Sequence, residues 1–301
     1  MKQINFEKYQ LSKLSFGTVQ LGLDYGISNI EGKPTQRNAN EIINYLIGQG
    51  IDSFDTAVAY GNSEEVLGNA LERQRHVHVI SKIKSNLFID NVEYVVRDSL
   101  ERLKSDKLFA LLLHDCEVLK KWNTQDTKRV KSLQDKELIE YFGISIYTTD
   151  EFDMAIENSS IQVIQIPFNI FDQRAVNNDW FKRAKETNKL IFIRSVFLQG
   201  LFFMKNTQLR GNLVAAIPYL TKLHTLRKEL KLTISECALS YVDSVASEAI
   251  LLFGCDTLEQ AKENIESYNN LPKLDSEIVM MINKTFLKVP THIIDPSEWS
   301  K

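Results

Sequence analysis

Cysteine is scarce in this chain: Cys116, Cys237 and Cys255 are the three cysteines of 301 residues, and they lie far apart. Their number and spacing argue against a disulfide framework or a zinc cluster, so we expect a reducing compartment, the cytoplasm. The N-terminal segment has no apolar run of signal-peptide length. No stretch approaches the roughly 20 apolar residues of a membrane span, so we expect no membrane partner.

An excess of positive charge is also missing. Lys and Arg total 36 against 39 Asp and Glu, which gives a formal net charge of −3. Nucleic acids call for a basic protein surface, so we expect no nucleic-acid partner. The 6 prolines interrupt the chain rarely, and no low-complexity linker divides it. With 44% hydrophobic residues, we predict a single domain with a sizeable core over residues 1–301.

What the sequence does have is a regular alternation of apolar runs and amphipathic segments. The runs have the length of β-strands, and most are apolar without alternation, which is typical of strands buried on both faces. The eight runs are residues 14–18, 51–55, 77–83, 108–114, 139–145, 161–167, 189–195 and 248–254. The segments between them carry apolar residues at helical spacing, as in residues 42–47 and 258–268.

Eight strands, each followed by a helix, predict an α/β fold, a single (β/α)8 TIM barrel. An open, doubly wound sheet is the alternative. No glycine-rich dinucleotide turn follows any of the runs, which argues against that alternative. The segment 196–212 is longer than its counterparts and rich in Phe and Gly, so we expect it to serve the ligand.

Four polar residues lie at or just after the ends of three successive runs, where the active site of a barrel is found. They are Asp55, Tyr60, Lys82 and His114. Each alone has a structural explanation, such as a helix cap or an ion pair. Together they form a proton-transfer set: an ammonium stabilises a phenolate and lowers a tyrosine pKa, a carboxylate holds the ammonium, and an imidazole orients a carbonyl.

With these residues in place, the chain resembles the aldo-keto reductases over nearly its whole length, from LSFGTVQLG to LLFGCDTLEQAKENIE. The segment FDTAVAYGNSEEVLGNAL is similar to the family signature around its catalytic Asp and Tyr, here Asp55 and Tyr60. The family's Lys and His match Lys82 in VISKI and His114 in LLLHD. The resemblance implies reduction of an aldehyde or ketone with a nicotinamide cofactor and no metal, with Tyr60 giving the proton.

The same resemblance implies contacts to the nicotinamide. Ser145 and Gln165 match the positions that hold its carboxamide, although Gln165 could instead bond the barrel backbone. The family's usual Asn after that Ser is replaced by Ile146, and Asn169 is our candidate to supply a polar contact to nicotinamide or substrate. Arg194 falls where the family often stacks an aromatic ring; it could stack there or bind a substrate carboxylate or phosphate.

Near the C-terminus the resemblance implies contacts to the rest of the cofactor. Gly254 would offer its backbone N–H to phosphate, and Glu263 and Asn264 match the adenine contacts. Gln260 stands where NADP-binding relatives often carry Arg, and Asp256 lies close by. We therefore expect NADP(H) or NAD(H) to bind with weak discrimination.

The substrate is the least defined part of the prediction. Tyr25, just after the first run, is a candidate substrate contact. The segment GTVQLGLDYGI resembles a bacterial branch whose members are often sugar-related, so we expect a small carbonyl compound, such as a sugar or another polyhydroxy carbonyl. A cofactor-binding barrel without turnover, acting as a regulatory module, is the alternative. The sequence leaves the oligomeric state open.

Overall fold

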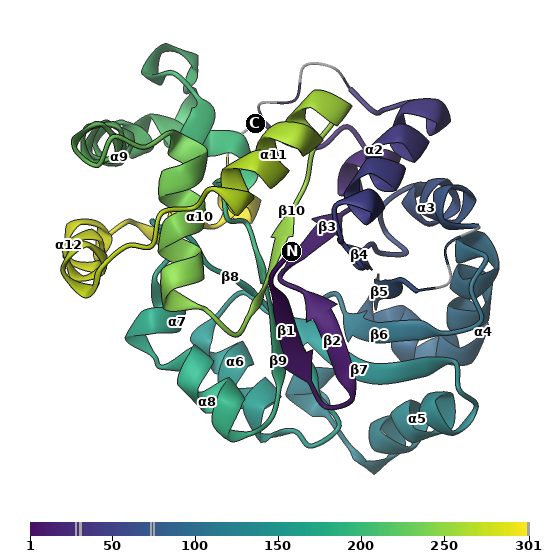
Figure 1. The fold of residues 1–301 in the computed structure, drawn as a ribbon. Coiled ribbons are helices and arrows are strands. Elements are labelled where there is room, and N and C mark those ends of the chain that lie inside the picture. Colours follow the sequence, from purple (N-terminus) through teal and green to yellow (C-terminus); the bar gives the residue numbers. More distant parts are fainter. Residues whose placement is uncertain (28, 30–31, 73, 75, 300–301) are drawn as a thin grey trace.

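The computed structural model describes residues 1–27, 29, 32–72, 74 and 76–299 (Figure 1). Its parallel strands close into a barrel in the order β10-β3-β4-β5-β6-β7-β8-β9. They are β3 (Leu14–Gly17), β4 (Ser53–Asp55), β5 (His78–Ile83), β6 (Leu108–Leu113), β7 (Ile139–Ser145), β8 (Val163–Pro167), β9 (Leu190–Arg194) and β10 (Ile250–Phe253). The predicted (β/α)8 barrel is confirmed, and each strand falls inside one of the eight apolar runs.

Helices follow the strands and surround the barrel (Figure 1). They are α1 (Val19–Gly22), α2 (Gln36–Gly48), α3 (Ser63–Leu71), α4 (Ser85–Leu103), α5 (Thr124–Asp135), α6 (Thr149–Glu157), α7 (Arg174–Asn177), α8 (Trp180–Glu186), α9 (Ile217–Glu229), α10 (Ile234–Val245), α11 (Leu258–Asn269), α12 (Ser276–Phe286) and α13 (Thr291–Ile294). The apolar stripes of α2 and α11 face inward as predicted: Ile42 and Ile43 of α2 and Ala261 and Ile265 of α11 are buried.

A two-stranded hairpin covers the N-terminal end of the barrel, a feature that the sequence reasoning missed. It consists of β1 (Gln3–Phe6) and β2 (Tyr9–Ser12) and lies across the near end of the barrel in Figure 1. The ring of Phe6 packs 5.1 Å from that of Tyr141, and the ring of Tyr9 packs 5.2 Å from that of Phe109. These contacts close the N-terminal end of the barrel. The C-terminal ends of the strands lie at the opposite end.

The segment after β9 forms three short 3-10 helices, η2 (Leu198–Phe203), η3 (Asn206–Gln208) and η4 (Gly211–Ala216). Phe202 is buried, with its ring 4.8 Å from that of Phe171. Phe203 is exposed and lines the cavity described below. The helix η2 therefore contributes Phe202 to the core and Phe203 to the wall of the cavity.

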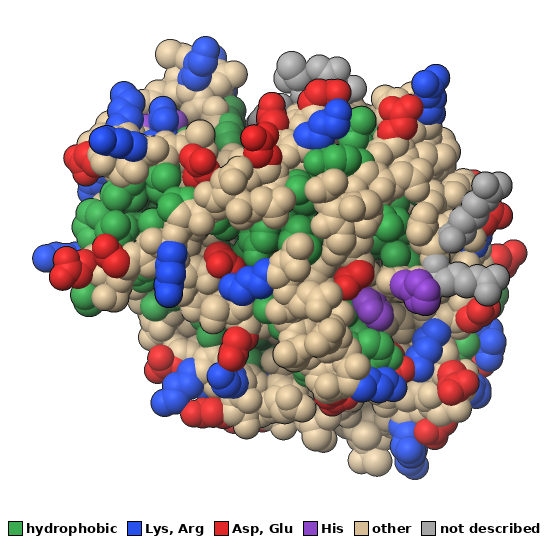
Figure 2. Space-filling model, viewed as in Figure 1, with side chains coloured by type: hydrophobic (Ala, Val, Ile, Leu, Met, Phe, Trp, Pro, Cys, Tyr) green, Lys and Arg blue, Asp and Glu red, His purple; other side chains and the backbone are tan. Residues whose placement is uncertain are grey.

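Charges of both signs are interspersed on the face shown in Figure 2. Hydrophobic side chains gather there at the left, over α9, α10 and α12. No helix in the described part of the chain is both long enough and apolar enough to cross a membrane.

Candidate active site

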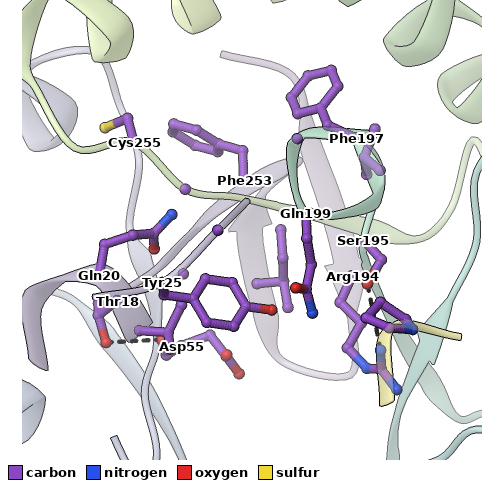
Figure 3. Close-up of a pocket in the computed structure, with 18 of the residues that line it drawn as sticks. Thr18, Gln20, Tyr25, Asp55, Arg194, Ser195, Phe197, Gln199, Phe253 and Cys255 are labelled. Carbon is purple, nitrogen blue, oxygen red and sulfur yellow. Dashed lines mark hydrogen bonds between the residues drawn. The ribbon is translucent and has the colours of Figure 1, made fainter. Parts of the chain in front are cut away.

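A cavity of about 690 Å3 lies at the C-terminal ends of the barrel strands. Figure 3 shows Tyr25, Asp55 and Arg194 around it, brought together from segments far apart in the sequence. The predicted site residues that line it are Tyr25, Asp55, Tyr60, His114, Ser145, Gln165, Arg194, Gly254, Gln260, Glu263 and Asn264. Lys82 is buried against Asp55 and does not line the cavity itself.

A buried ion pair joins the ends of β4 and β5. The Lys82 Nζ atom lies 2.5 Å from Asp55 Oδ2 and donates a second bond of 2.9 Å to the Thr56 carbonyl. The other carboxylate oxygen, Oδ1, accepts a bond of 2.8 Å from Gln165 Nε2. Burial lowers the pKa of Lys82, and the Asp55 carboxylate opposes that shift. One carboxylate therefore fixes both the ammonium and the glutamine amide.

Tyr60 and His114 face each other beside this pair. Their ring centroids are 5.6 Å apart, and the Lys82 Nζ atom lies 5.0 Å from the Tyr60 centroid. The expectation that Lys82 lowers the pKa of Tyr60 is not met: burial raises that pKa, and the Asp55 carboxylate raises it further. Asp55 lies against Lys82 and offsets its positive charge. The phenol is held in its protonated form, as a proton donor requires.

His114 follows β6, and its imidazole is neutral. Burial, followed by the positive charges of Lys82 and Arg194, lowers the pKa of His114 to about 4. Its Nδ1 atom is buried and makes no hydrogen bond within the described part of the chain. A neutral imidazole carries one N–H donor, and this can hydrogen-bond a carbonyl oxygen placed beside Tyr60.

A close approach of two backbone segments positions Tyr60. Gly22, at the end of α1, lies so near that a Cβ atom there would be 1.7 Å from the Tyr60 carbonyl oxygen. Gly61 has a φ of +57°, a left-handed conformation that favours glycine, and its Cβ would lie 2.4 Å from the Gly22 carbonyl oxygen. The sequence reasoning did not single out Gly22, although it stands in the quoted segment LSFGTVQLG.

The ends of β7 and β8 place Ser145 directly beside Gln165. The two residues are paired in the sheet register, and the Ser145 hydroxyl lies 3.4 Å from Gln165 Oε1. Both are buried and line the cavity. A hydroxyl and an amide side by side match the donors and acceptors of a carboxamide, so this pair fits the nicotinamide end of the cofactor.

The segment between β10 and α11 fits the phosphate end. A Cβ at Gly254 would lie 2.4 Å from Gln20 Nε2, so the missing side chain makes room for the Gln20 amide. Gln20 Oε1 is buried without a partner among the described residues. Gln260 Oε1 accepts a bond of 2.7 Å from the Asp256 backbone N–H. Asp256 Oδ1 accepts one of 3.2 Å from Asn29. Of the described lining residues, Arg194 alone is Lys or Arg.

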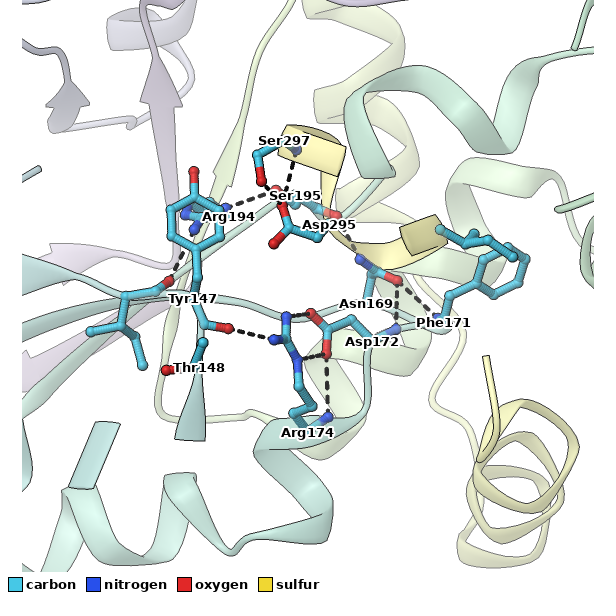
Figure 4. A network of polar contacts seen from close by, with 12 residues as sticks. Tyr147, Thr148, Asn169, Phe171, Asp172, Arg174, Arg194, Ser195, Asp295 and Ser297 are labelled. Atoms are coloured by element: carbon cyan, nitrogen blue, oxygen red, sulfur yellow. Dashed lines mark hydrogen bonds and ion pairs between the residues drawn. The ribbon is translucent and has the colours of Figure 1, made fainter. Parts of the chain in front are cut away.

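Asn169 requires a correction. It is fully buried, and it does not line the cavity. Its Nδ2 donates to the Ser195 carbonyl at 3.0 Å, and its Oδ1 accepts from the backbone N–H groups of Phe171 and Asp172 at 2.8 and 3.0 Å (Figure 4). Because these bonds occupy its amide, Asn169 does not replace the contact missing at Ile146; it supports the segment after β9.

Arg194 lies at the end of β9 beside Ser145. Its guanidinium carbon is 4.0 Å from the centroid of the Tyr147 ring, and its Nη2 donates to the Ile146 carbonyl at 2.9 Å. Sequence reasoning missed Tyr147, which follows β7 without any motif of its own. One face of the guanidinium is thus already covered by protein.

Comparison with known proteins identifies the family. The model of the Aldo/keto reductase family matches residues 13–285. The chain therefore belongs to the aldo/keto reductase family and is an NAD(P)H-dependent oxidoreductase.

Individual relatives are distant but match along most of their length. The uncharacterized oxidoreductase YqkF of Bacillus subtilis is 25% identical over 300 residues, which cover 91% of this chain and 97% of that protein. D-arabinose 1-dehydrogenase of Saccharomyces cerevisiae is 23% identical over 322 residues, covering 94% and 92%. The solved aldo-keto reductase AKR11C1 from Bacillus halodurans, in its holo form, matches with a TM-score of 0.77 at 20% identity, covering 95% and 96%.

Proposed function

We propose that this enzyme reduces an aldehyde or ketone to an alcohol, with Tyr60 as the proton donor. The observation that carries the proposal is the convergence of Tyr60, His114 and the Asp55–Lys82 ion pair at one end of a single cavity. When bound, a reduced nicotinamide cofactor would supply the hydride for the carbonyl carbon. The carbonyl oxygen takes its proton from the Tyr60 hydroxyl, which is later reprotonated from solvent.

Each residue near Tyr60 has a separate task. The neutral imidazole of His114 donates a hydrogen bond to the carbonyl oxygen and orients it toward the phenol. Lys82 Nζ lies 5.0 Å from the Tyr60 ring centroid, so its ammonium, although the Asp55 carboxylate offsets part of its charge, would stabilise the phenolate that forms as the proton leaves. Asp55 keeps that ammonium charged and in place, since burial alone would favour the neutral amine.

Contacts along the rest of the cavity would hold the cofactor. Ser145 and Gln165 would bind the nicotinamide carboxamide, because they present a hydroxyl and an amide side by side. Gly254 would offer its backbone N–H to a phosphate. Glu263 and Asn264, which line the cavity on α11, would contact adenine.

The cofactor preference should be weak. A 2′-phosphate needs charged donors, preferably Arg, but Gln260 and Asp256 line the end of the cavity where we place the adenosine. We expect the specificity constants for NADPH and NADH to differ by less than about tenfold, or roughly 1.4 kcal/mol. The double substitution Asp256→Ser and Gln260→Arg should shift the preference toward NADPH. A wild-type preference for NADPH above about a hundredfold in steady-state kinetics would contradict this reasoning.

The substrate class we propose is a sugar or another polyhydroxy carbonyl compound. The relative named D-arabinose 1-dehydrogenase supports this class. Polar side chains in the cavity wall, among them Ser195, Gln199 and Ser297, can hydrogen-bond hydroxyl groups. Tyr25 lines the same wall.

We further propose that residues 1–301 form one domain and that the enzyme works in the cytoplasm. The family match over residues 13–285 supports the first statement. The second is supported by the cysteines, which are all free and buried.

Replacement of Tyr60 by Phe tests the assignment of the proton donor. General acid catalysis contributes about 10²–10⁴-fold, so Tyr60→Phe should lose that much turnover while binding cofactor as before. Cofactor oxidation is followed with a panel of small aldehydes, and cofactor binding by fluorescence titration. The control is Tyr94→Phe on the surface of α4, where the tyrosine is 64% exposed. A Tyr60→Phe enzyme that retains more than about a tenth of wild-type turnover would refute the role.

A further inference from the structure

The charges in the cavity are distributed unevenly between its two ends. At the catalytic end the Asp55 carboxylate is compensated by Lys82, at 2.5 Å. Asp256 and Glu263 lie at the other end, around the start of α11. Among the described lining residues this leaves the Arg194 guanidinium as the uncompensated charge near Tyr60 and His114, so the catalytic end is positive.

Arg194 has hydrogen-bonding capacity to spare. A guanidinium has five N–H donors. Nη2 donates to the Ile146 carbonyl at 2.9 Å, while Nε and Nη1 reach the hydroxyls of Ser145 and Ser195 only at 3.4 Å. None of the ion pairs found among the described residues involves Arg194. The two remaining N–H groups and the two long bonds are available to a ligand in the cavity.

The surrounding structure holds this guanidinium in place, as Figure 4 shows. One face lies on the Tyr147 ring at 4.0 Å. The Tyr147 carbonyl accepts a bond from Arg174, which pairs with the buried Asp172 at 2.6 Å. Asn169 holds the Ser195 carbonyl on the other side. A preorganised guanidinium loses little side-chain entropy when it binds an anion.

We propose that the substrate of this enzyme carries an anionic group, a carboxylate or a phosphate, and that Arg194 binds it while the carbonyl lies between Tyr60 and His114. The proposal rests on the reductase function argued above and narrows its substrate class. A planar guanidinium edge pairs well with either anion through parallel N–H···O bonds. His114, being neutral, offers no competing charge, and Tyr147 already covers one face on which a neutral ring could stack.

Two aldehydes of nearly identical shape test the proposal. 4-Carboxybenzaldehyde and 4-nitrobenzaldehyde differ chiefly in the charge of the group opposite the carbonyl. The measured quantity is the ratio of their kcat/KM values, in which any effect of a substitution on cofactor binding or hydride transfer cancels. In Arg194→Gln the ratio of carboxylate to nitro substrate should fall about 10–100-fold, the range of a hydrogen-bonded charge. Arg194→Lys, which keeps the charge but loses the planar fork, should fall less.

A binding measurement provides a readout that does not depend on turnover. In the presence of oxidised cofactor, 4-(hydroxymethyl)benzoate should bind wild type at least tenfold more tightly than Arg194→Gln, whereas 4-nitrobenzyl alcohol should show no such difference. Glyceraldehyde compared with glyceraldehyde 3-phosphate then distinguishes a phosphate site from a carboxylate site.

The outcomes separate the two proposals. Equal ratios in wild type and Arg194→Gln, with equal binding of the benzoate, would overturn the anion site while leaving the reductase function intact. Loss of cofactor affinity in Arg194→Gln, without a change in the ratio of the two kcat/KM values, would assign Arg194 to the nicotinamide. That result would also overturn the anion site. Absence of cofactor binding and of carbonyl reduction by wild type would instead refute the proposed function.

Discussion

Replacement of His114 by Gln should change how the stability of the enzyme depends on pH. Burial and two nearby cations, Lys82 and Arg194, lower the pKa of His114 to about 4 in the folded chain. In the unfolded chain a histidine titrates near about 6.5. Between these two values the unfolded state binds the extra proton and the folded state does not, so stability rises with pH in this window.

The size of the effect follows from the difference between the two pKa values. Each unit corresponds to about 1.4 kcal/mol, so as pH falls the folded state loses up to about 3 kcal/mol. The loss begins below pH 6.5 or so and levels off below about pH 4. Between pH 7 and pH 4.5 it amounts to about 2 kcal/mol. Glutamine has no titrating group, and His114→Gln should lack this contribution.

Urea denaturation at pH 7 and pH 4.5 measures the difference directly. The free energy of unfolding of wild type should fall by about 2 kcal/mol more than that of His114→Gln over this interval. His76→Gln, at an exposed position, is the control for replacing a histidine. A difference below about 0.5 kcal/mol would show that His114 titrates normally and that the neutral imidazole assumed in the mechanism is wrong.

Two further substitutions test the packing around the site. Lys82→Met should lower the free energy of unfolding by about 3–5 kcal/mol, because Asp55 would keep a buried, uncompensated charge. Adding Asp55→Asn should restore part of that stability in urea denaturation but none of the activity; no recovery would refute the ion-pair argument. Gly22→Ala should lower the free energy of unfolding by about 1–3 kcal/mol or more, because the added methyl group meets the Tyr60 carbonyl. It should also remove much of the turnover. Gly48→Ala, with nothing within 4 Å, should instead leave the melting temperature unchanged or raise it.

The barrel could be predicted from sequence because its strands are buried on both faces. That burial makes each strand a continuous apolar run, and the strands indeed lie within the eight runs. The hairpin of residues 3–12 escaped because it has one face on the barrel and one in solvent, and each strand has only four residues. Segments of this length give little periodic signal.

The shared location of the residues that we propose as catalytic could be predicted for a related reason. Residues at the ends of parallel strands must meet at one end of a barrel, so linear order gave Asp55, Lys82 and His114 a common location. Asn169 shows where this reasoning fails. It follows a strand end too, but its amide turns back to the backbone of its own loop and of Ser195. The direction of a loop side chain depends on contacts that no spacing rule contains.

Asp55 joins the two parts of the site that the mechanism treats separately. Its Oδ2 contacts Lys82 of β5, and its Oδ1 accepts from Gln165 of β8, on the far side of the barrel. Gln165 in turn lies 3.4 Å from Ser145, so one carboxylate links the proton-transfer set to the pair proposed to hold the nicotinamide. A carboxylate with both oxygens engaged has little freedom to move. Its buried position therefore fixes Lys82 and Gln165 relative to each other. In the proposed mechanism this would help to set the geometry between the proton donor and the nicotinamide, which a two-part transfer to one carbonyl requires.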